Sequence, residues 1–429
     1  MTPAGADHAD AAAERAILKA ARRLIPFLAA CYFASYLDRV NLGFAALSMN
    51  RDLNFSPLVY GWGAGVFFLG YSLFEVPSNL FLHRVGARLW IARIMIGWAV
   101  ASGAMAFVYD GASFLALRFI LGSAEAGFAP GIILYLTYWF PQAWRARALG
   151  QFLFAIPLSS AAGAPLSTLA LTFMDGALGL RGWQWLFVLE ALPALFLGVA
   201  TLLLLTERPA RAAWLSPEER EALDARLAQE AAQRPPEPAD AHWRALRDPR
   251  VLMLGAAYFG VVAALYGLGF WLPQIVAGFG FGVALSTLLT SLPYVCGGVA
   301  MIYWTRRCDR RGDGFAHTAL ASGIAALGLA AAALFDAPAP ALAALCVAAV
   351  GTLAAIPVFW TLPTQFLAGG GAAAGIALVN SLGNLAGFAG PYAVGWIKSA
   401  TGSFSVALLA LVVGPLWTAA AMLWMRRSR

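Results

Sequence analysis

Four charged side chains lie deep within long apolar stretches of the chain. They are Asp38, Arg39, Arg118 and Glu125. A charge at the centre of a lipid bilayer costs about 3 kcal/mol on insertion scales, so such residues are expected to be paired and to serve a function. A guanidinium in a medium of low dielectric binds a carboxylate well, and a buried carboxyl can take up and release a proton. These residue types therefore predict anion binding and proton exchange.

The spacing of the four charges predicts how they meet. Asp38 and Arg39 are adjacent, so their side chains project about 100° apart on a helix and face different neighbours. Arg118 and Glu125 are seven residues apart, which places them on one helical face at a separation of about 10 Å. We expect cross-helix pairing, in which Arg118 or Glu125 meets Asp38 or Arg39 in a central cavity. The alternative is a static lattice of salt bridges between two helices.

The elements that position these charges are predicted to be membrane helices. The chain has 429 residues, of which 61% are hydrophobic and 12% are charged, and its mean hydropathy is +0.71. A soluble core could not bury this much apolar surface. Continuous apolar runs of about 20 residues favour helices, which satisfy their backbone groups internally, over a transmembrane barrel.

The sequence predicts an all-α membrane protein with 12 transmembrane helices in two six-helix halves. The expected spans are residues 24–48, 58–82, 89–109, 111–137, 147–172, 183–206, 251–278, 283–304, 314–336, 340–366, 371–397 and 403–425. The expected organisation is an N-terminal tail (1–23), the first half (24–206), a linker (207–250), the second half (251–425) and a short tail (426–429). Within the linker, the segment from Ser216 to Glu219 has the pattern of a capping box, with Pro at the first helical position. It predicts a helix to about residue 230.

Basic residues are distributed unevenly around these spans. With the N-terminus in the cytoplasm, most of the 29 Lys and Arg residues fall on the cytoplasmic side, as the positive-inside rule requires. Arg51, Arg181 and Lys398 fall outside. We therefore expect a multi-pass protein of the plasma membrane, in a bacterium the inner membrane, with both termini cytoplasmic. The same bias explains the +7 net charge without a nucleic-acid partner.

The chain offers little for other chemistry. The four cysteines have no metal-ligand spacing, and the four histidines lie in or beside cytoplasmic segments, so any proton relay must use carboxylates. No nucleophile, metal cluster or phosphate-binding loop is recognisable. We expect no cofactor, no metal and no enzymatic activity. Glu75 and Glu190 are further buried acids without an obvious cation within the membrane, for which structural, gating and proton-handling roles remain open.

The second half has no charge at the centre of any span and carries polar and aromatic groups instead. These include Tyr266, Trp271, Trp360, Asn380 and Asn384. The two asparagines are four residues apart on one helical face, where an amide in lipid would be costly, so they are expected to line a cavity. Trp271 and Trp360 have an alternative interpretation as anchors at the membrane surface. Recognition of a substrate is therefore expected to involve this half.

The chain also resembles a known family. The loops from His83 to Gly86 and from Asp309 to Gly312 occupy equivalent places in the two halves and resemble the loop motif of the major facilitator superfamily, although the first copy departs from it. Five further segments resemble the anion:cation symporter family within that superfamily: Tyr36 to Asn41, Gly70 to Asn79, Arg118 to Pro130, Tyr266 to Gln274, and Asn380 to Asn384.

This resemblance implies the major facilitator fold and secondary active transport. The implied activity is proton-coupled symport (uptake) of a small organic anion, such as tartrate, an aldonate or hexonate, or an aromatic carboxylate, by alternating access. Asp38 and Glu125 match proton-carrying acids, and Arg118 matches a coupling arginine. The expected substrate-binding residues are Arg39, Tyr71, Tyr266, Trp360, Asn380 and Asn384.

Two other classes of protein stay open. A drug/proton antiporter could share the fold, although Arg39 and Arg118 at the centre disfavour cationic drugs. A sensor or channel that does not transport is the other alternative. The expected partners are the substrate anion, protons and the lipid bilayer, and the expected state is a monomer.

Overall fold

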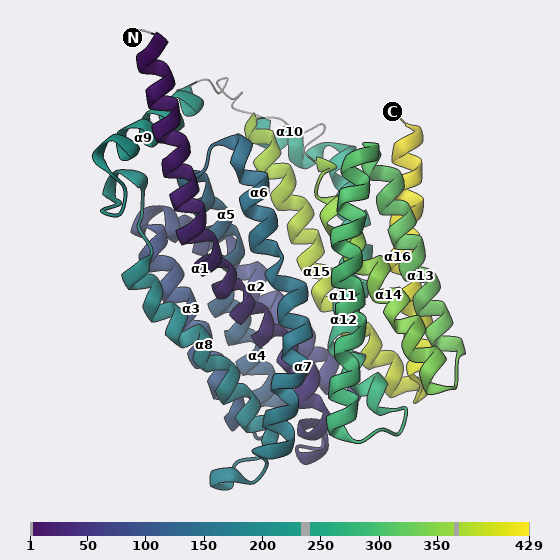
Figure 1. Ribbon diagram of the computed structural model, residues 1–429. Coiled ribbons are helices and arrows are strands. Elements are labelled where there is room, and N and C mark those ends of the chain that lie inside the picture. Colours follow the sequence, from purple (N-terminus) through teal and green to yellow (C-terminus); the bar gives the residue numbers. More distant parts are fainter. Residues whose placement is uncertain (1–2, 233–240, 364–368, 429) are drawn as a thin grey trace.

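The computed structural model describes residues 3–232, 241–363 and 369–428, and within these ranges the regular elements are all helical. The helices form two bundles that stand side by side, and both termini lie at the same end of the molecule (Figure 1). We call this the termini-bearing end. The side chains of His83 and Asp309, from the two loop motifs, lie outside the described set.

The helices follow the predicted order. The first half contains α1 (Pro3–Asp52), α2 (Pro57–Val85), α3 (Ala87–Ala104), α4 (Gly111–Glu125), α5 (Phe128–Trp139), α6 (Gln142–Leu153), α7 (Ala155–Phe173) and α8 (Gly182–Leu204). The segment between the halves contains α9 (Pro217–Ala232) and α10 (Ala241–Arg247). The second half contains α11 (Pro249–Ala277), α12 (Val283–Arg311), α13 (Gly314–Leu334), α14 (Pro338–Phe359), α15 (Gly369–Thr401) and α16 (Phe404–Arg427).

Within the described residues, 10 helical spans are long and apolar enough to cross a membrane, with α4–α5 and α6–α7 each counted as one span. The other two long helices are α1, which carries Asp38 and Arg39, and α15, which carries two asparagines and several glycines. Both run through the bundle beside the apolar spans (Figure 1). They therefore complete the predicted twelve-helix architecture, although their polar residues lower their hydropathy.

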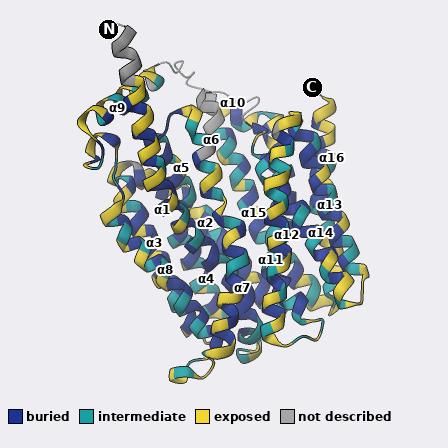
Figure 2. Ribbon diagram, viewed as in Figure 1, coloured by how far each residue is buried: buried dark blue, intermediate teal, exposed yellow. Residues whose placement is uncertain are grey.

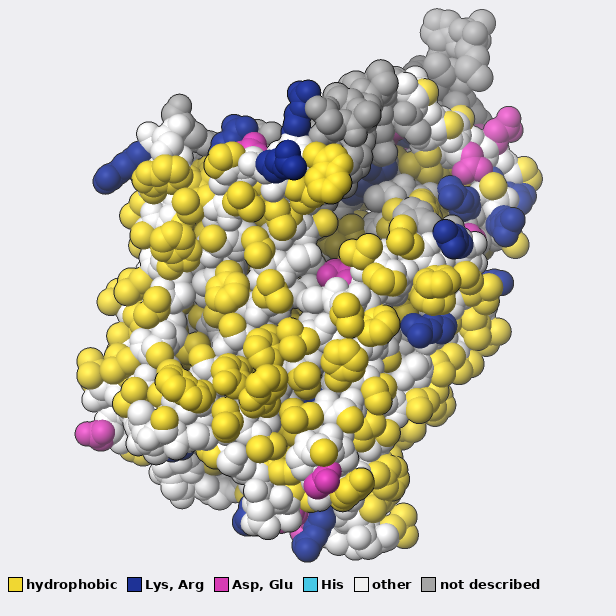
Figure 3. Space-filling view, turned by 180° about the vertical axis from the view of Figure 1, so that it is seen from behind, with side chains coloured by type: hydrophobic (Ala, Val, Ile, Leu, Met, Phe, Trp, Pro, Cys, Tyr) yellow, Lys and Arg dark blue, Asp and Glu magenta, His cyan; other side chains and the backbone are white. Residues whose placement is uncertain are grey.

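The outer surface matches a protein that is surrounded by lipid. Large apolar side chains such as Leu73, Val100, Phe196 and Leu327 are exposed on the helices. Figure 2 shows exposed residues on the outer faces of the bundles as well as at their ends. In Figure 3, hydrophobic side chains cover the middle of the visible face, and charged side chains gather towards the two ends. An apolar surface of this extent requires an apolar solvent, so the chain is an integral membrane protein.

The predicted fourth span, residues 111–137, is present from Gly111 to Trp139, but its helix is interrupted. The helix stops after Glu125, Gly127 adopts a left-handed conformation with φ 85°, and α5 starts at Phe128. Pro130 explains the break, because it has no N–H to donate to the carbonyl of Ala126 and its ring crowds that carbonyl.

Two other spans also differ from their expected form. The fifth starts earlier than predicted and is divided into α6 and α7 around Phe154. The tenth ends at Phe359 instead of residue 366, and the predicted residues 364–366 lie outside the described part of the chain.

The helix predicted after Ser216 is present as α9. The Ser216 hydroxyl accepts a hydrogen bond from the Glu219 N–H at 3.2 Å, and the Glu219 carboxylate accepts one from the Ser216 N–H at 3.0 Å, which is a capping box. Lys19 on α1 forms an ion pair with Glu219 at 2.7 Å. The segment between the halves is therefore attached to the start of α1.

In the described ranges, the main contacts across the seam between the halves are those of α1 with α11, α2 with α15, and α7 with α12. At the end opposite the termini, the hydroxyl of Tyr60 on α2 donates to the carbonyl of Phe270 on α11 at 2.8 Å. Close approach of α2 and α15 depends on glycine, because a Cβ on Gly61 would lie 2.8 Å from the Pro391 carbonyl oxygen. The halves are therefore in close contact at this end.

Candidate functional site

A buried ion pair lies at the centre of the seam. Arg39 on α1 donates through Nη2 to the Glu125 carboxylate at the end of α4. The same Glu125 oxygen accepts a hydrogen bond from Ser35 at 2.7 Å. Arg39 also donates through Nη1 to the hydroxyl of Tyr266 on α11 at 3.1 Å. The cross-helix pairing expected from the sequence is thus present, and it extends to the second half through Tyr266.

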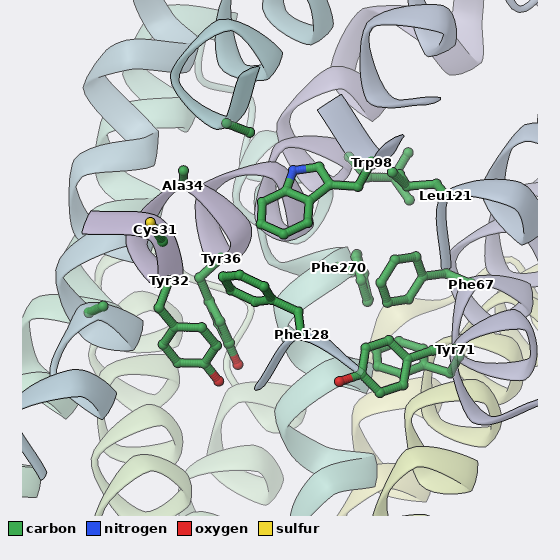
Figure 4. Packing of buried hydrophobic residues seen from close by; sticks show 14 of the residues in the cluster. Cys31, Tyr32, Ala34, Tyr36, Phe67, Tyr71, Trp98, Leu121, Phe128 and Phe270 are labelled. Carbon is green, nitrogen blue, oxygen red and sulfur yellow. The ribbon is translucent and has the colours of Figure 1, made fainter. Parts of the chain in front are cut away.

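Aromatic rings surround the Arg39 guanidinium. Its Cζ lies 5.4 Å from the ring centre of Tyr36, 5.3 Å from that of Phe67 and 5.8 Å from that of Tyr71. Figure 4 shows these rings among the buried aromatic residues from several helices. Ring faces attract a cation, and the attraction is stronger when water is excluded. The cage therefore stabilises the positive charge of the guanidinium, whose Nε has no hydrogen-bond partner among the described residues.

The break after α4 determines the position of Glu125. The last carbonyl groups of a helix lack partners within it and carry partial negative charge. Glu125 adds a full negative charge at this terminus, so a nearby cation is needed, and Arg39 supplies it. The pair therefore joins α1 to the broken helix at the point where it can bend.

Arg118 makes different contacts from those expected. It is fully buried, but its Nε donates to the Gly63 carbonyl oxygen at 2.9 Å, and its Nη2 lies 3.5 Å from the Ala64 carbonyl oxygen. Among the described residues it forms no ion pair with Asp38 or Glu125. It lies 4.9 Å from the Phe67 ring centre, so Phe67 contacts both central arginines.

Asp38 faces α3 and not the Arg39 cage. It accepts hydrogen bonds from Ser102 on α3 and from the amide of Asn41 at 3.0 Å. The prediction that Asp38 and Arg39 have different neighbours is therefore correct. One acid of the expected proton path lies in the ion pair, and the other lies among neutral groups.

Asn380 and Asn384 on α15 were expected to line a cavity, and in the structure both amides bind a carboxylate. They donate to the two oxygens of Glu75 on α2 at 3.1 and 3.2 Å. Glu75 thus has two amide partners in the other half and no ion pair with a cation among the described residues. This contact joins the halves on the side of the Arg39 pair nearer the termini-bearing end, because α2 runs towards that end (Figure 1).

The remaining predicted residues lie at different distances from the ion pair. Tyr71 is buried beside Arg39, and Tyr266 bonds to it. Trp360 instead donates to the hydroxyl of Tyr258 at 3.2 Å. Tyr258 lies on α11, about two helical turns before Tyr266, so Trp360 is further from the ion pair. Trp271 is fully buried and donates to the Pro391 carbonyl oxygen at 3.1 Å, so it is not an anchor at the membrane surface.

The sequence analysis did not single out Ser35, Ser102 or Phe67 as parts of the site. A signal existed for Ser35, which lies four residues before Arg39 and so shares its helical face. Ser102 lies in an apolar helix, where a serine can also bond to its own backbone. Nothing distinguishes Phe67 from other core phenylalanines in the sequence, because its role depends on two arginines from different helices.

A small cavity lies beside Arg39 between the halves. It is lined by residues of both, including Tyr36, Ser160, Tyr266 and Tyr294, and its volume is about 30 Å³. This is room for about two water molecules. An organic anion would therefore need the halves to separate around Arg39.

Two helical bundles with buried charges and a cavity at their interface are the arrangement found in many secondary transporters. Residues 28–391 match the Major Facilitator Superfamily. The chain belongs to this superfamily of membrane transporters.

Relatives agree with this assignment, and a solved structure has a similar fold. A protein of Agrobacterium vitis, provisionally named as a tartrate transporter, is 50% identical over 91% of this chain and 87% of its own length. A quinolone resistance transporter of Acinetobacter baumannii is 41% identical over 91% of this chain and 90% of its own length. The fold is similar to a bacterial homologue of the human lysosomal transporter Spinster, with a TM-score of 0.75 and 17% identity over 95% of this chain and 97% of that structure.

Proposed function

We propose that the protein is a proton-coupled symporter that takes up a small organic anion such as tartrate, an aldonate or hexonate, or an aromatic carboxylate. The observation that carries this proposal is the Arg39–Glu125 pair, which lies beside a cavity shared by both halves. A guanidinium in such a place can bind a carboxylate through two parallel hydrogen bonds. The relative named for tartrate supports a dicarboxylate within this class.

The ion pair gives a route to coupling. A substrate carboxylate that binds Arg39 competes with Glu125 for the same guanidinium. Glu125 would then be a buried carboxylate without a cation, and the proton is the charge that can neutralise it. Binding of the anion and of the proton therefore favour each other, with Asp38 as a second proton carrier and Arg118 as the residue that couples the two events.

The second half contributes recognition and closure. The hydroxyl of Tyr266 accepts a hydrogen bond from Arg39, and we propose that Tyr266 contacts the substrate. The further substrate contacts in our proposal are Tyr71, Trp360, Asn380 and Asn384. The amides of Asn380 and Asn384 become available when they separate from Glu75. Alternating access then consists of opening one end of the seam while the other stays closed.

The proton also supplies energy. Uptake of a monoanion against a potential of 100 mV, inside negative, costs about 2.3 kcal/mol. One proton cancels this cost, and a second proton makes accumulation favourable. We propose that the protein is a monomer in the bacterial inner membrane. We propose further that both termini lie in the cytoplasm, because this orientation puts most of the basic residues inside.

Export of a drug is the second candidate, and the quinolone resistance relative favours it. Uptake assays distinguish the two. In proteoliposomes with an acidic exterior, symport predicts accumulation of labelled tartrate, gluconate or phthalate, which collapses when a protonophore dissipates the gradient. Proton-driven movement of a labelled quinolone in the opposite direction to the protons, without uptake of any of these anions, would contradict symport.

A further inference from the structure

A pair of acids lies on a different face of α1 from the Arg39 cage. Glu190 on α8 is 3% exposed and Asp38 is 3% exposed, and the two carboxyls are close enough to interact electrostatically. The packing of α1 against α8, and of α8 against α3 and α7, encloses them. Glu190 is thus not an isolated acid but a neighbour of a residue already assigned to the proton path.

Neutral groups surround both acids. Ser167 on α7 donates to Glu190 at 3.3 Å, and Ser102 on α3 donates to Asp38. Asn41 donates to Asp38 and also faces Glu190. Within the described residues, no Lys, Arg or His forms a hydrogen bond or ion pair with either acid. From α4, Arg118 and Glu125 act on Asp38 only at longer range, since Arg118 donates to backbone carbonyls.

Within the part of the chain that the structure describes, two polar atoms in this cluster have no hydrogen-bond partner. They are Oε2 of Glu190 and Oδ1 of Asn41, and both residues are almost completely buried. Both atoms are acceptors. A buried acceptor without a donor is costly, and two neighbouring carboxylates without a cation are more costly. The cluster therefore lacks one positive charge and at least one donor, and a proton supplies both.

We propose that Asp38 and Glu190 form a proton-binding pair that holds one proton between them, and that Glu190 belongs to the coupling machinery. This inference rests on the proposed symport, in which Asp38 carries a proton. It gives that proton a defined place, separate from the Glu125 carboxyl. The two proton sites then lie on different faces of α1, and only the Glu125 site competes directly with the substrate for Arg39.

Infrared spectroscopy of the purified full-length protein tests the pair without any transport assay. Wild type should show the carbonyl stretch of a protonated carboxyl at neutral pH. In Glu190→Gln, Asp38 no longer faces a like charge, so the band should disappear at a pH about one unit or more lower than in wild type. Glu221→Gln, which changes an exposed acid on α9, is the matched control and should leave the band unchanged.

Other outcomes would overturn the pair. The pair would be contradicted by an unchanged band in Glu190→Gln or by a wild-type spectrum without the band. Loss of the band when sodium is added would also contradict it, because a metal cation would then take the place of the proton. If Glu190→Gln fails to fold, Asp38→Asn gives the same test, because Glu190 then no longer faces a like charge and the band should likewise disappear at a lower pH than in wild type.

Transport assays distinguish an error in the proposed Asp38–Glu190 pair from an error in the proposed symport. As the pH is raised, proton-driven tartrate uptake by Glu190→Gln should decline at a lower pH than uptake by wild type. Absence of proton-driven uptake in wild type itself would contradict the proposed function but leave the infrared result standing. Normal wild-type coupling with an identical pH profile in Glu190→Gln would overturn the role of Glu190 alone.

Discussion

Asp38 and Arg39 are adjacent in the sequence, yet they belong to two separate networks. Arg39 is paired with an acid at the end of α4 and touches the second half of the protein, whereas Asp38 bonds to neutral groups within the first half. Rotation of about 100° per residue along α1 produces this division. One turn of helix thereby connects a candidate anion site to a candidate proton site.

Replacement of Arg39 by lysine tests the anion site. Arg39→Lys keeps the charge but loses the planar fork. Hydrogen bonds to charged groups contribute about 1.5–3 kcal/mol, so anion uptake at low substrate concentration should fall about 10- to 100-fold. Labelled tartrate uptake in proteoliposomes measures the change. Arg93→Lys, at an exposed arginine of α3, should leave uptake unchanged, and equal losses in both variants would contradict a specific role for Arg39.

The Glu75 contact is expected to hold the termini-bearing end of the seam closed. Glu75→Gln replaces two charge-assisted hydrogen bonds with weaker neutral ones. A loss of about 1–2 kcal/mol would shift the equilibrium about 5- to 30-fold towards opening at that end. Spin labels on the exposed Val85 of α2 and Leu423 of α16 should then report a larger population of long distances.

The control for this experiment is Glu221→Gln, which removes an exposed acid from α9. It should leave the distance distribution as in wild type. A Glu75→Gln distribution that is indistinguishable from wild type would mean that the contact with Asn380 and Asn384 does not restrain the seam.

Much of this arrangement was predictable from local sequence rules. Helical periodicity placed Arg118 and Glu125 on one buried face, and the cost of an unpaired charge in the membrane predicted a partner for Glu125 on another helix. Pro130 was a readable signal that the fourth span is interrupted, but the sequence alone did not place the break directly after Glu125. Local patterns determine which face of a helix a side chain occupies.

The contacts between helices were less predictable. The pairing of Glu75 with Asn384 depends on how far α2 is shifted along α15, which is set by packing over their whole length. Arg118 binds backbone carbonyls near Gly63, and no sequence pattern shows which carbonyls approach a guanidinium. The assignment of partners to these residues therefore required the tertiary structure.

Gly61 offers a test of the closed end of the seam. In Gly61→Ala the new Cβ would lie 2.8 Å from the Pro391 carbonyl oxygen and 3.1 Å from the Gly395 Cα, so α2 and α15 must move apart. Overpacking of this kind costs about 1–3 kcal/mol, and the thermal unfolding temperature should fall. Gly150→Ala, where nothing lies within 4 Å of the added Cβ, should be neutral or slightly stabilising. A drop of the same size in both variants would argue against close packing at Gly61.

The central claim is that Glu125 takes a proton when the substrate displaces it from Arg39. The most direct measurement compares two assays of Glu125→Gln in proteoliposomes: tartrate uptake driven by a pH gradient, and exchange of labelled for unlabelled tartrate without a gradient. The glutamine keeps its hydrogen-bonding capacity but cannot ionise. We predict that gradient-driven accumulation is abolished while exchange continues. Accumulation of tartrate by Glu125→Gln at the wild-type level would contradict the claim.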